Sequence, residues 1–246
     1  MKIRVSRTLV AILLCGLATV SHNVMATTMT LQHQGSAYGF LNGNIKADFT
    51  PTTWWNPGTW GLETRSASAG GLNMLDTSTG KSLIAWCVDV FTSLSNKFDY
   101  TVGSSTQLRN SDALQKLVNQ RYSQVSDTRT SAAFQLAIWE IVTDTGGGYS
   151  LNNGTFQANG FGNAQALARD WLKLDGANTG NYKISYFYDG ILNDKKTSQN
   201  LIAISSVPLP GAAVLMLSAL GVAGLMGRRR RAAKPLSNAE QSAVAI

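Results

Sequence analysis

The pattern of apolar and polar positions divides the chain into a middle segment and two different ends. Leu9–Val20 is a short apolar run behind basic residues, and 211–227 is an apolar run in front of four arginines. Between these runs, apolar positions first come in short stretches and then, from about residue 110, recur at helical spacing. We therefore predict an exported α+β domain at 27–206, with a β-rich N-terminal part, a central helical insertion and C-terminal strands.

Short β-branched or aromatic stretches bounded by Gly, Asn, Pro and Ser predict the strands of this domain. The first six are Met29–His33, Ala37–Leu41, Ile45–Thr50, Leu72–Leu75, Leu83–Phe91 and Lys97–Val102. Asn42-Gly43 is a dipeptide favoured in hairpin turns. Residues 51–71, with three tryptophans and several glycines, indicate a loop.

Apolar positions at helical spacing predict three helices, at Ser111–Tyr122 (with Ser111 as N-cap), Asp127–Asp144 and Asn163–Leu174. In the second helix we expect a buried stripe of Ala133, Phe134, Ala137, Ile138 and Ile141, with the triple glycine 146–148 ending the helix. Two more strands follow, at Tyr182–Tyr188 and Leu201–Ser206. Strands, helices and again strands in one segment favour the α+β class.

The N-terminus has the pattern of a secretory signal peptide at 1–26. Its charged region holds Lys2, Arg4 and Arg7, and its apolar region is Leu9–Val20. Val24-Met25-Ala26 places small residues where a signal peptidase reads them, which predicts cleavage after Ala26.

The C-terminus has the pattern of a membrane-spanning helix followed by a stop-transfer signal. The predicted helix 211–227 would be about 26 Å long, just short of the ~30 Å hydrocarbon core of a bilayer. The four basic residues Arg228, Arg229, Arg230 and Arg231 come directly after it. The positive-inside rule places these arginines and the tail 232–246 in the cytoplasm and the preceding domain outside.

The net charge of +7 is carried entirely by the two ends of the chain. Residues 1–26 carry +3, residues 208–246 carry +4, and the segment between them has 13 basic and 13 acidic residues. A domain without net positive charge has no basic face to meet phosphates. The charge distribution therefore argues against nucleic acid as a partner.

The order of features at 207–231 resembles the PEP-CTERM sorting signal of Gram-negative bacteria. Val207-Pro208-Leu209-Pro210-Gly211 precedes the apolar helix and the arginines, and resembles the Val-Pro-Leu-Pro variant of that signal. Leu209 replaces the usual Glu, and the tail extends beyond the usual end. The resemblance implies processing by a membrane-embedded exosortase near Pro208, Leu209 and Pro210, in a setting of exopolysaccharide production. An ordinary C-terminal membrane anchor is the alternative.

The chemistry open to the exported segment is restricted, because His33 is its only histidine and Cys87 its only cysteine. A histidine-based zinc site needs more ligands than these, and a Ser-His-Asp triad would have to use His33. The triple glycine lacks the spacing and the lysine of a phosphate-binding loop. We therefore expect no metal, no cofactor and no enzymatic turnover, while a hydrolase using a pair of the 13 carboxylates stays open.

Cys87 requires an explanation, because an unpaired cysteine is unusual in an oxidising compartment. It is either a buried small apolar residue, one half of an intermolecular disulfide, or a partner of Gln135. Gln135 lies off the apolar stripe of the predicted second helix, where a glutamine is usually solvated.

Two sequence blocks around these residues, Ala85-Trp86-Cys87-Val88-Asp89 and Phe134-Gln135-Leu136-Ala137-Ile138-Trp139, resemble those of bacterial thioester domains. In that family a Cys on a strand attacks the side-chain amide of a Gln on a helix, ammonia leaves, and an internal thioester forms. The resemblance implies this role for Cys87 and Gln135, with Asp89 and Trp139 in support. It also implies single-use covalent adhesion to a surface partner that bears an amine or hydroxyl.

Trp54, Trp55 and Trp60 are candidates for a second kind of function. Exposed tryptophans stack on sugar rings, although such residues more often cap a sheet. The alternative function is therefore a non-covalent exopolysaccharide-associated matrix or glycan-binding protein. In either case the protein passes through an inner-membrane intermediate and ends at the cell surface or outside the cell.

Overall fold

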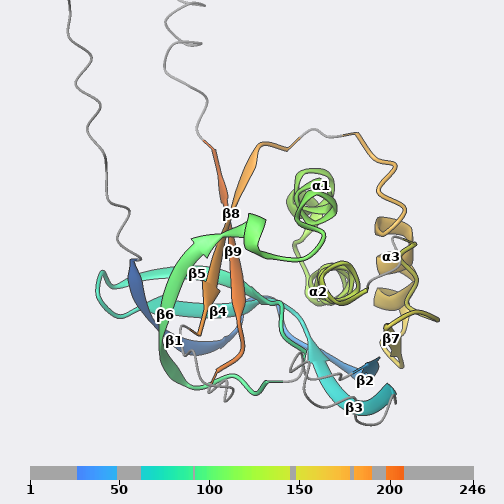
Figure 1. The fold of residues 1–246 in the computed structure, drawn as a ribbon, viewed down its shortest axis with the longest axis horizontal. Helices are drawn as coiled ribbons and strands as arrows, with labels where there is room; N and C mark the ends of the chain where they lie inside the picture. Colours follow the sequence, from blue (N-terminus) through green and yellow to red (C-terminus); the bar gives the residue numbers. More distant parts are fainter. Residues whose placement is uncertain are drawn as a thin grey trace, which may run out of the picture.

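The computed structural model describes residues 27–48, 62–90, 92–144, 148–177, 180–189 and 198–207. The predicted signal peptide, Trp54, Trp55, Trp60, the residues from Pro208 onward and the predicted helix 211–227 lie outside these ranges. No helix in the described ranges is long and apolar enough to cross a membrane. The described chain is a strand-rich mixture of strands and three α-helices, which confirms the predicted mixed class (Figure 1).

Six strands form a closed antiparallel barrel in the order β1-β4-β5-β9-β8-β6 (Figure 1). Their bounds are β1 Thr28–Ser36, β4 Leu72–Asp76, β5 Lys81–Cys87, β6 Lys97–Ser104, β8 Tyr182–Tyr188 and β9 Leu201–Ser206. The last two strands lie between β5 and β6, so residues from both ends of the domain close the barrel. The helical insertion therefore leaves the barrel after β6 and returns to it at β8.

Three further strands form a second antiparallel sheet beside the barrel, in the order β3-β2-β7. They are β2 Leu41–Asp48, β3 Leu62–Ala69 and β7 Phe156–Asn159. Because β7 comes from the helical insertion and the other two from the N-terminal part, this sheet joins the two parts of the domain.

The α-helices lie on one side of the barrel, with α2 between the barrel and α3 (Figure 1). Their bounds are α1 Ser111–Arg121, α2 Thr128–Thr143 and α3 Asn163–Trp171, and two 3-10 turns, η1 Ser105–Gln107 and η2 Tyr122–Gln124, flank α1. Asp127 caps α2 by accepting a bond from the backbone of Thr130. The predicted stripe of α2 is buried, and so are all the remaining residues from Thr130 to Ile141.

One aromatic contact and one buried hydrogen bond fix α2 against β5 and the start of β4. The rings of Trp86 on β5 and Phe134 on α2 meet edge to face with centroids 4.9 Å apart. One turn earlier, Ser131 Oγ accepts a 2.9 Å bond from the backbone N–H of Gly71, just before β4. These contacts set which residues of α2 face the end of β5.

Several local predictions are wrong. Asn42-Gly43 is not a hairpin turn but lies inside β2. The glycine has a packing role there, since a Cβ at Gly43 would lie 2.6 Å from Cε2 of Phe161. Ala37–Leu41 is not a strand, since β2 begins only at Leu41.

Three further differences concern two strands and a helix cap. Residues 62–69, placed in a loop by the prediction, form β3 through an eight-residue register with β2, and the short β7 was not predicted. The N-cap of α1 is Asn110, in a left-handed conformation at φ +53°, instead of Ser111. Asparagine tolerates that conformation better than most residues.

Candidate functional site

The site begins with an unpaired edge of backbone at the C-terminal end of β5. On one side, Cys87 pairs with Leu201 of β9. On the other side, the register of β4 with β5 ends at Leu72 opposite Ala85. The backbone of Cys87 therefore lies beyond the last β4 pair, with polar groups that need partners from elsewhere.

The side chain of Gln135 supplies those partners. The backbone N–H of Cys87 donates to Gln135 Oε1 at 3.0 Å, and Gln135 Nε2 donates to the carbonyl oxygen of Cys87 at 2.7 Å. Gln135 is 0% exposed and Cys87 is 7% exposed. Gln135 is thus not a solvated residue on a helix surface. The structure brings together Cys87 and Gln135, the two residues that the resemblance to thioester domains had paired.

The thiol of Cys87 faces a second glutamine. Cys87 Sγ donates to Gln199 Oε1 at 2.8 Å, and Gln199 Nε2 donates to the carbonyl oxygen of Asp89. Burial raises the pKa of the Cys87 thiol far above its usual range, and the charge of Asp89 adds to the rise. The thiol is therefore protonated at neutral pH.

Sequence reasoning missed Gln199. It lies just before β9, in a polar Ser198-Gln199-Asn200 segment that carries no periodic signal. No local pattern in the sequence marks Gln199 as a partner of Cys87. Contact with Cys87 depends on the barrel register that places β9 beside β5.

The two residues predicted to support the pair have different surroundings. Asp89 holds the turn after β5, where its carboxylate accepts a 2.9 Å bond from Thr92 Oγ1. Trp139 is buried and packs against Phe156 of β7, with ring centroids 6.2 Å apart. None of the hydrogen bonds described at Cys87 involves His33, which lies on β1.

The hydrogen bonds of the Gln135 carboxamide bear on how it would respond to attack at its carbonyl carbon Cδ. Its oxygen already accepts a bond from a backbone N–H, so negative charge developing on Oε1 during attack at Cδ would be stabilised. Its nitrogen is the potential leaving group, and the protonated thiol carries the proton that an ammonia molecule requires.

Two carboxyl groups near the end of α2 form a second buried polar cluster. Glu140 and Asp144 are both buried, and the backbone N–H of Ser150 donates to Glu140 Oε1 at 2.6 Å. Burial raises the pKa of Glu140 to about 8, and the charge of Asp144 adds to the rise. A polysaccharide chain has no access to carboxyls buried in this way, so this pair does not favour the hydrolase alternative. The described residues hold no group of three metal-ligating side chains.

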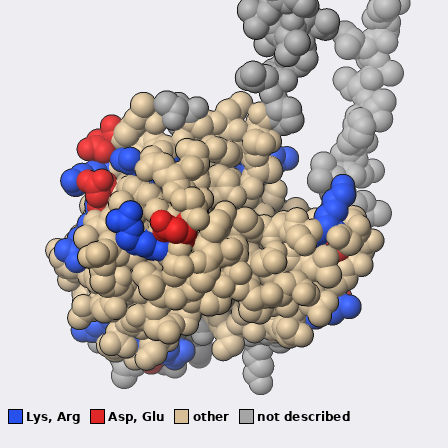
Figure 2. All heavy atoms as spheres, turned by 180° about the vertical axis from the view of Figure 1, so that it is seen from behind, with Lys and Arg blue, Asp and Glu red and all other residues tan. Residues whose placement is uncertain are grey.

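The surface of the domain is mostly uncharged. On the face shown in Figure 2, basic and acidic residues are scattered among a majority of neutral side chains, with cations and carboxylates close to one another. This agrees with the equal numbers of basic and acidic residues between the two ends of the chain.

Comparison with known proteins identifies the C-terminal signal. Residues 206–231 match the family described as the PEP-CTERM protein-sorting motif. No curated protein matches the chain, and no solved structure does. The motif implies export, a membrane-anchored sorting intermediate and processing by an exosortase.

Proposed function

We propose that this exported, exosortase-sorted protein is a surface adhesin that binds its partner covalently through an internal thioester between Cys87 and Gln135. The observation that carries the proposal is the pair of hydrogen bonds, 3.0 and 2.7 Å long, that hold the Gln135 carboxamide on the backbone of Cys87. The resemblance of both sequence blocks to thioester domains supports the same assignment.

In the proposed first step, Cys87 Sγ attacks Gln135 Cδ. A bond forms between sulfur and carbon, the bond from Cδ to Nε2 breaks, and the thiol proton leaves with the nitrogen as ammonia. The backbone N–H of Cys87 stabilises the intermediate oxyanion on Oε1. The product is an acyl group activated for transfer and kept from water by burial.

In the second step, an amine or hydroxyl of the partner attacks the thioester carbonyl. An amide or ester forms at Gln135, and Cys87 recovers its proton as a free thiol. Cys87 keeps 7% of its surface exposed while Gln135 has none, so the partner group approaches from the Cys87 side. Each molecule makes one bond, and the protein acts as an anchor instead of an enzyme.

The sorting signal completes this proposal. The exosortase recognises the segment of Pro208, Leu209 and Pro210. The helix 211–227 spans the membrane, and the tail from Arg228 to residue 246 remains in the cytoplasm. The segment between Ala26 and Pro208 is then exposed outside the inner membrane and reaches the cell surface or extracellular matrix after processing.

Intact-mass measurement of the freshly purified full-length protein tests the thioester. We expect a deficit of one ammonia relative to the sequence mass, and a gain of one methylamine after incubation with that amine. The Cys87→Ala and Gln135→Ala variants should have neither change. Gln115→Ala, which alters a half-buried glutamine on α1, should have both.

The outcomes separate three roles for Gln135. A full sequence mass that methylamine does not change would mean that Gln135 only completes the hydrogen bonding of β5. A deficit with a linkage mapped by peptide fragmentation to Gln199 would move the acyl donor to the residue that accepts the thiol hydrogen bond. A linkage mapped between Cys87 and Gln135 supports the proposal. This mapping is done on the unmodified protein, so it does not depend on a variant that could misfold.

A further inference from the structure

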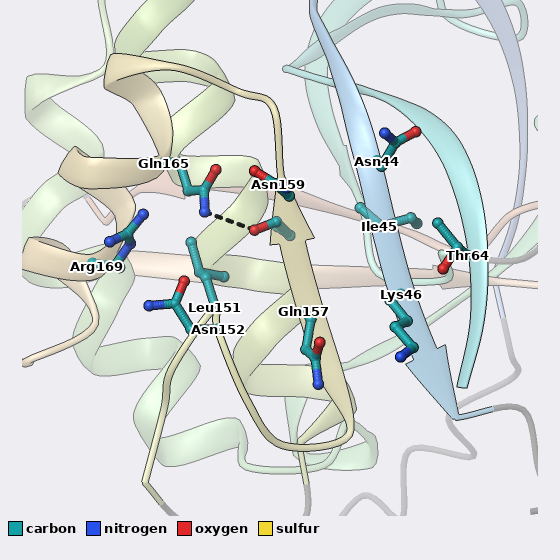
Figure 3. A pocket seen from close by; sticks show the side chains of 11 residues that line it. Asn44, Ile45, Lys46, Thr64, Leu151, Asn152, Gln157, Asn159, Gln165 and Arg169 are labelled. Atoms are coloured by element: carbon teal, nitrogen blue, oxygen red, sulfur yellow. Dashed lines mark hydrogen bonds between the residues drawn. The ribbon is translucent and has the colours of Figure 1, made fainter. Parts of the chain in front are cut away.

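A polar groove lies away from the Cys87–Gln135 pair, between α3, the loop after Tyr149 and the three-stranded sheet (Figure 3). Its volume is about 510 Å³, within the range of roughly 300–1,000 Å³ typical of small-molecule sites. Of the side chains that line it, Arg169 and Gln165 come from α3, Gln157 and Asn159 from β7, and Asn44 and Lys46 from β2.

The floor of the groove is fixed by bonds within the domain. Gln165 Nε2 donates to the carbonyl oxygen of Ala158 at 2.7 Å, which joins α3 to β7. The backbone N–H of Ala158 donates to the carbonyl oxygen of Leu151 at 2.9 Å, which joins the loop to the same strand. The groove is therefore preformed, and a ligand that enters it does not have to order its walls.

Carboxamides dominate the lining. The side chains of Asn44, Asn152, Gln157, Asn159 and Gln165 all border the groove, together with the hydroxyl of Thr64. Carboxamides offer N–H donors and an acceptor oxygen, which is the combination that pairs of sugar hydroxyls can satisfy, and one N–H of Gln165 is already used on Ala158. Ile45, Leu151 and Ala158 are its only apolar lining residues within the described ranges.

The groove also carries positive charge without a compensating carboxylate. Arg169 lies on its α3 side and Lys46 on its β2 side (Figure 3), and no Asp or Glu belongs to its described lining. Among the described residues neither Arg169 nor Lys46 has an ion-pair partner. Asp170, next to Arg169 in the chain, pairs with Lys173 at 2.8 Å. A ligand with carboxylates at its ends would neutralise both cations.

We propose that this groove binds an acidic oligosaccharide, of the uronic acid class, through its carboxamides and the two cations. A peptide is less suitable, because the lining has few apolar positions that could anchor peptide side chains. The site is separate from the thioester and does not depend on it.

Titration calorimetry of the full-length protein with tetragalacturonic acid tests this site. We expect binding that weakens with added salt, and that is weaker by about tenfold in Arg169→Gln and in Lys46→Gln, because each removes a charged hydrogen bond. Arg129→Gln and Lys183→Gln remove exposed cations from a helix and a strand away from the groove, and should bind as the unmodified protein does. Equal melting temperatures would establish that all four variants are folded.

Two further ligands identify the chemical class. Cellotetraose, a neutral chain of the same length, should bind about tenfold more weakly than the uronate, and a tetraglutamate peptide should not compete with it. Equal binding of cellotetraose would overturn the role of charge, and tighter binding of tetraglutamate would make the groove a site for acidic peptides. Failure of tetragalacturonic acid to bind, or binding that neither groove variant weakens, would overturn the site itself.

Discussion

The buried carboxyl of Glu140 makes the stability of this domain depend on pH in a direction opposite to that of most acids. Burial raises its pKa from 4.5 to about 8 in the folded protein. Between these values the folded state holds a proton that the unfolded state has released, so the free energy of unfolding falls as pH rises. The stabilising contribution is complete below pH 4.5 and is lost as pH rises through about 8.

The size of the effect follows from the shift. Each pH unit between the two pKa values removes about 1.4 kcal/mol, and the whole rise corresponds to at most about 5 kcal/mol. In Glu140→Gln the carboxamide oxygen can still accept the bond from Ser150 N–H, and no charge develops. We therefore expect the stability of the variant to be closest to that of the unmodified protein at pH 5, to exceed it increasingly up to about pH 8, and to keep a constant lead above that pH.

Urea unfolding of the full-length protein, followed by tryptophan fluorescence from pH 5 to pH 9, measures this difference. Glu63→Gln is the matched control, because Glu63 is exposed and pairs with Arg65 at the surface. Its difference from the unmodified protein should not vary over this range. A difference for Glu140→Gln that is equally flat would refute the reasoning, since it would mean that Glu140 ionises as readily when folded as when unfolded.

Two packing predictions concern the elements that carry the sites. Gly43→Ala should lower the free energy of unfolding by about 1–3 kcal/mol, because its Cβ would meet an aromatic ring at 2.6 Å, whereas Gly148→Ala, with nothing within 4 Å, should leave it unchanged. Ser131→Ala should cost about 1–3 kcal/mol, because it leaves the buried N–H of Gly71 without a partner, and the exposed Ser123→Ala should be neutral. Thermal unfolding followed by circular dichroism would check both pairs, and equal losses within a pair would contradict the packing argument.

Elements with strong periodicity were predictable from the sequence. β8 and β9 have the predicted bounds, and α2 differs from its prediction by one residue at each end. These segments are long or regular enough for their own side chains to specify one conformation. In contrast, β3 is a polar, small-residue strand whose pairing with β2 defines it, so no local pattern marks it.

The candidate site follows the same division. The resemblance pairs Cys87 with Gln135, but their contact depends on the early end of β4, which leaves the Cys87 backbone open to a side chain. Gln199 contacts Cys87 because β9 pairs with β5 in the barrel. A hydrogen bond between residues far apart in the chain is set by strand register and helix docking, which no local spacing encodes.

The amino-acid sequence is enough to identify the C-terminal sorting signal, the mixed fold class and the small set of residues able to do chemistry. The order of features at 206–231 is a linear sorting signal, so it can be read without a fold. Folding buries Gln135 on Cys87, closes the Glu140 carboxyl to solvent, and gathers amides from β2, β7, α3 and the loop after Tyr149 into one groove. Burial and convergence are properties of packing, and packing exists only once distant segments have come together.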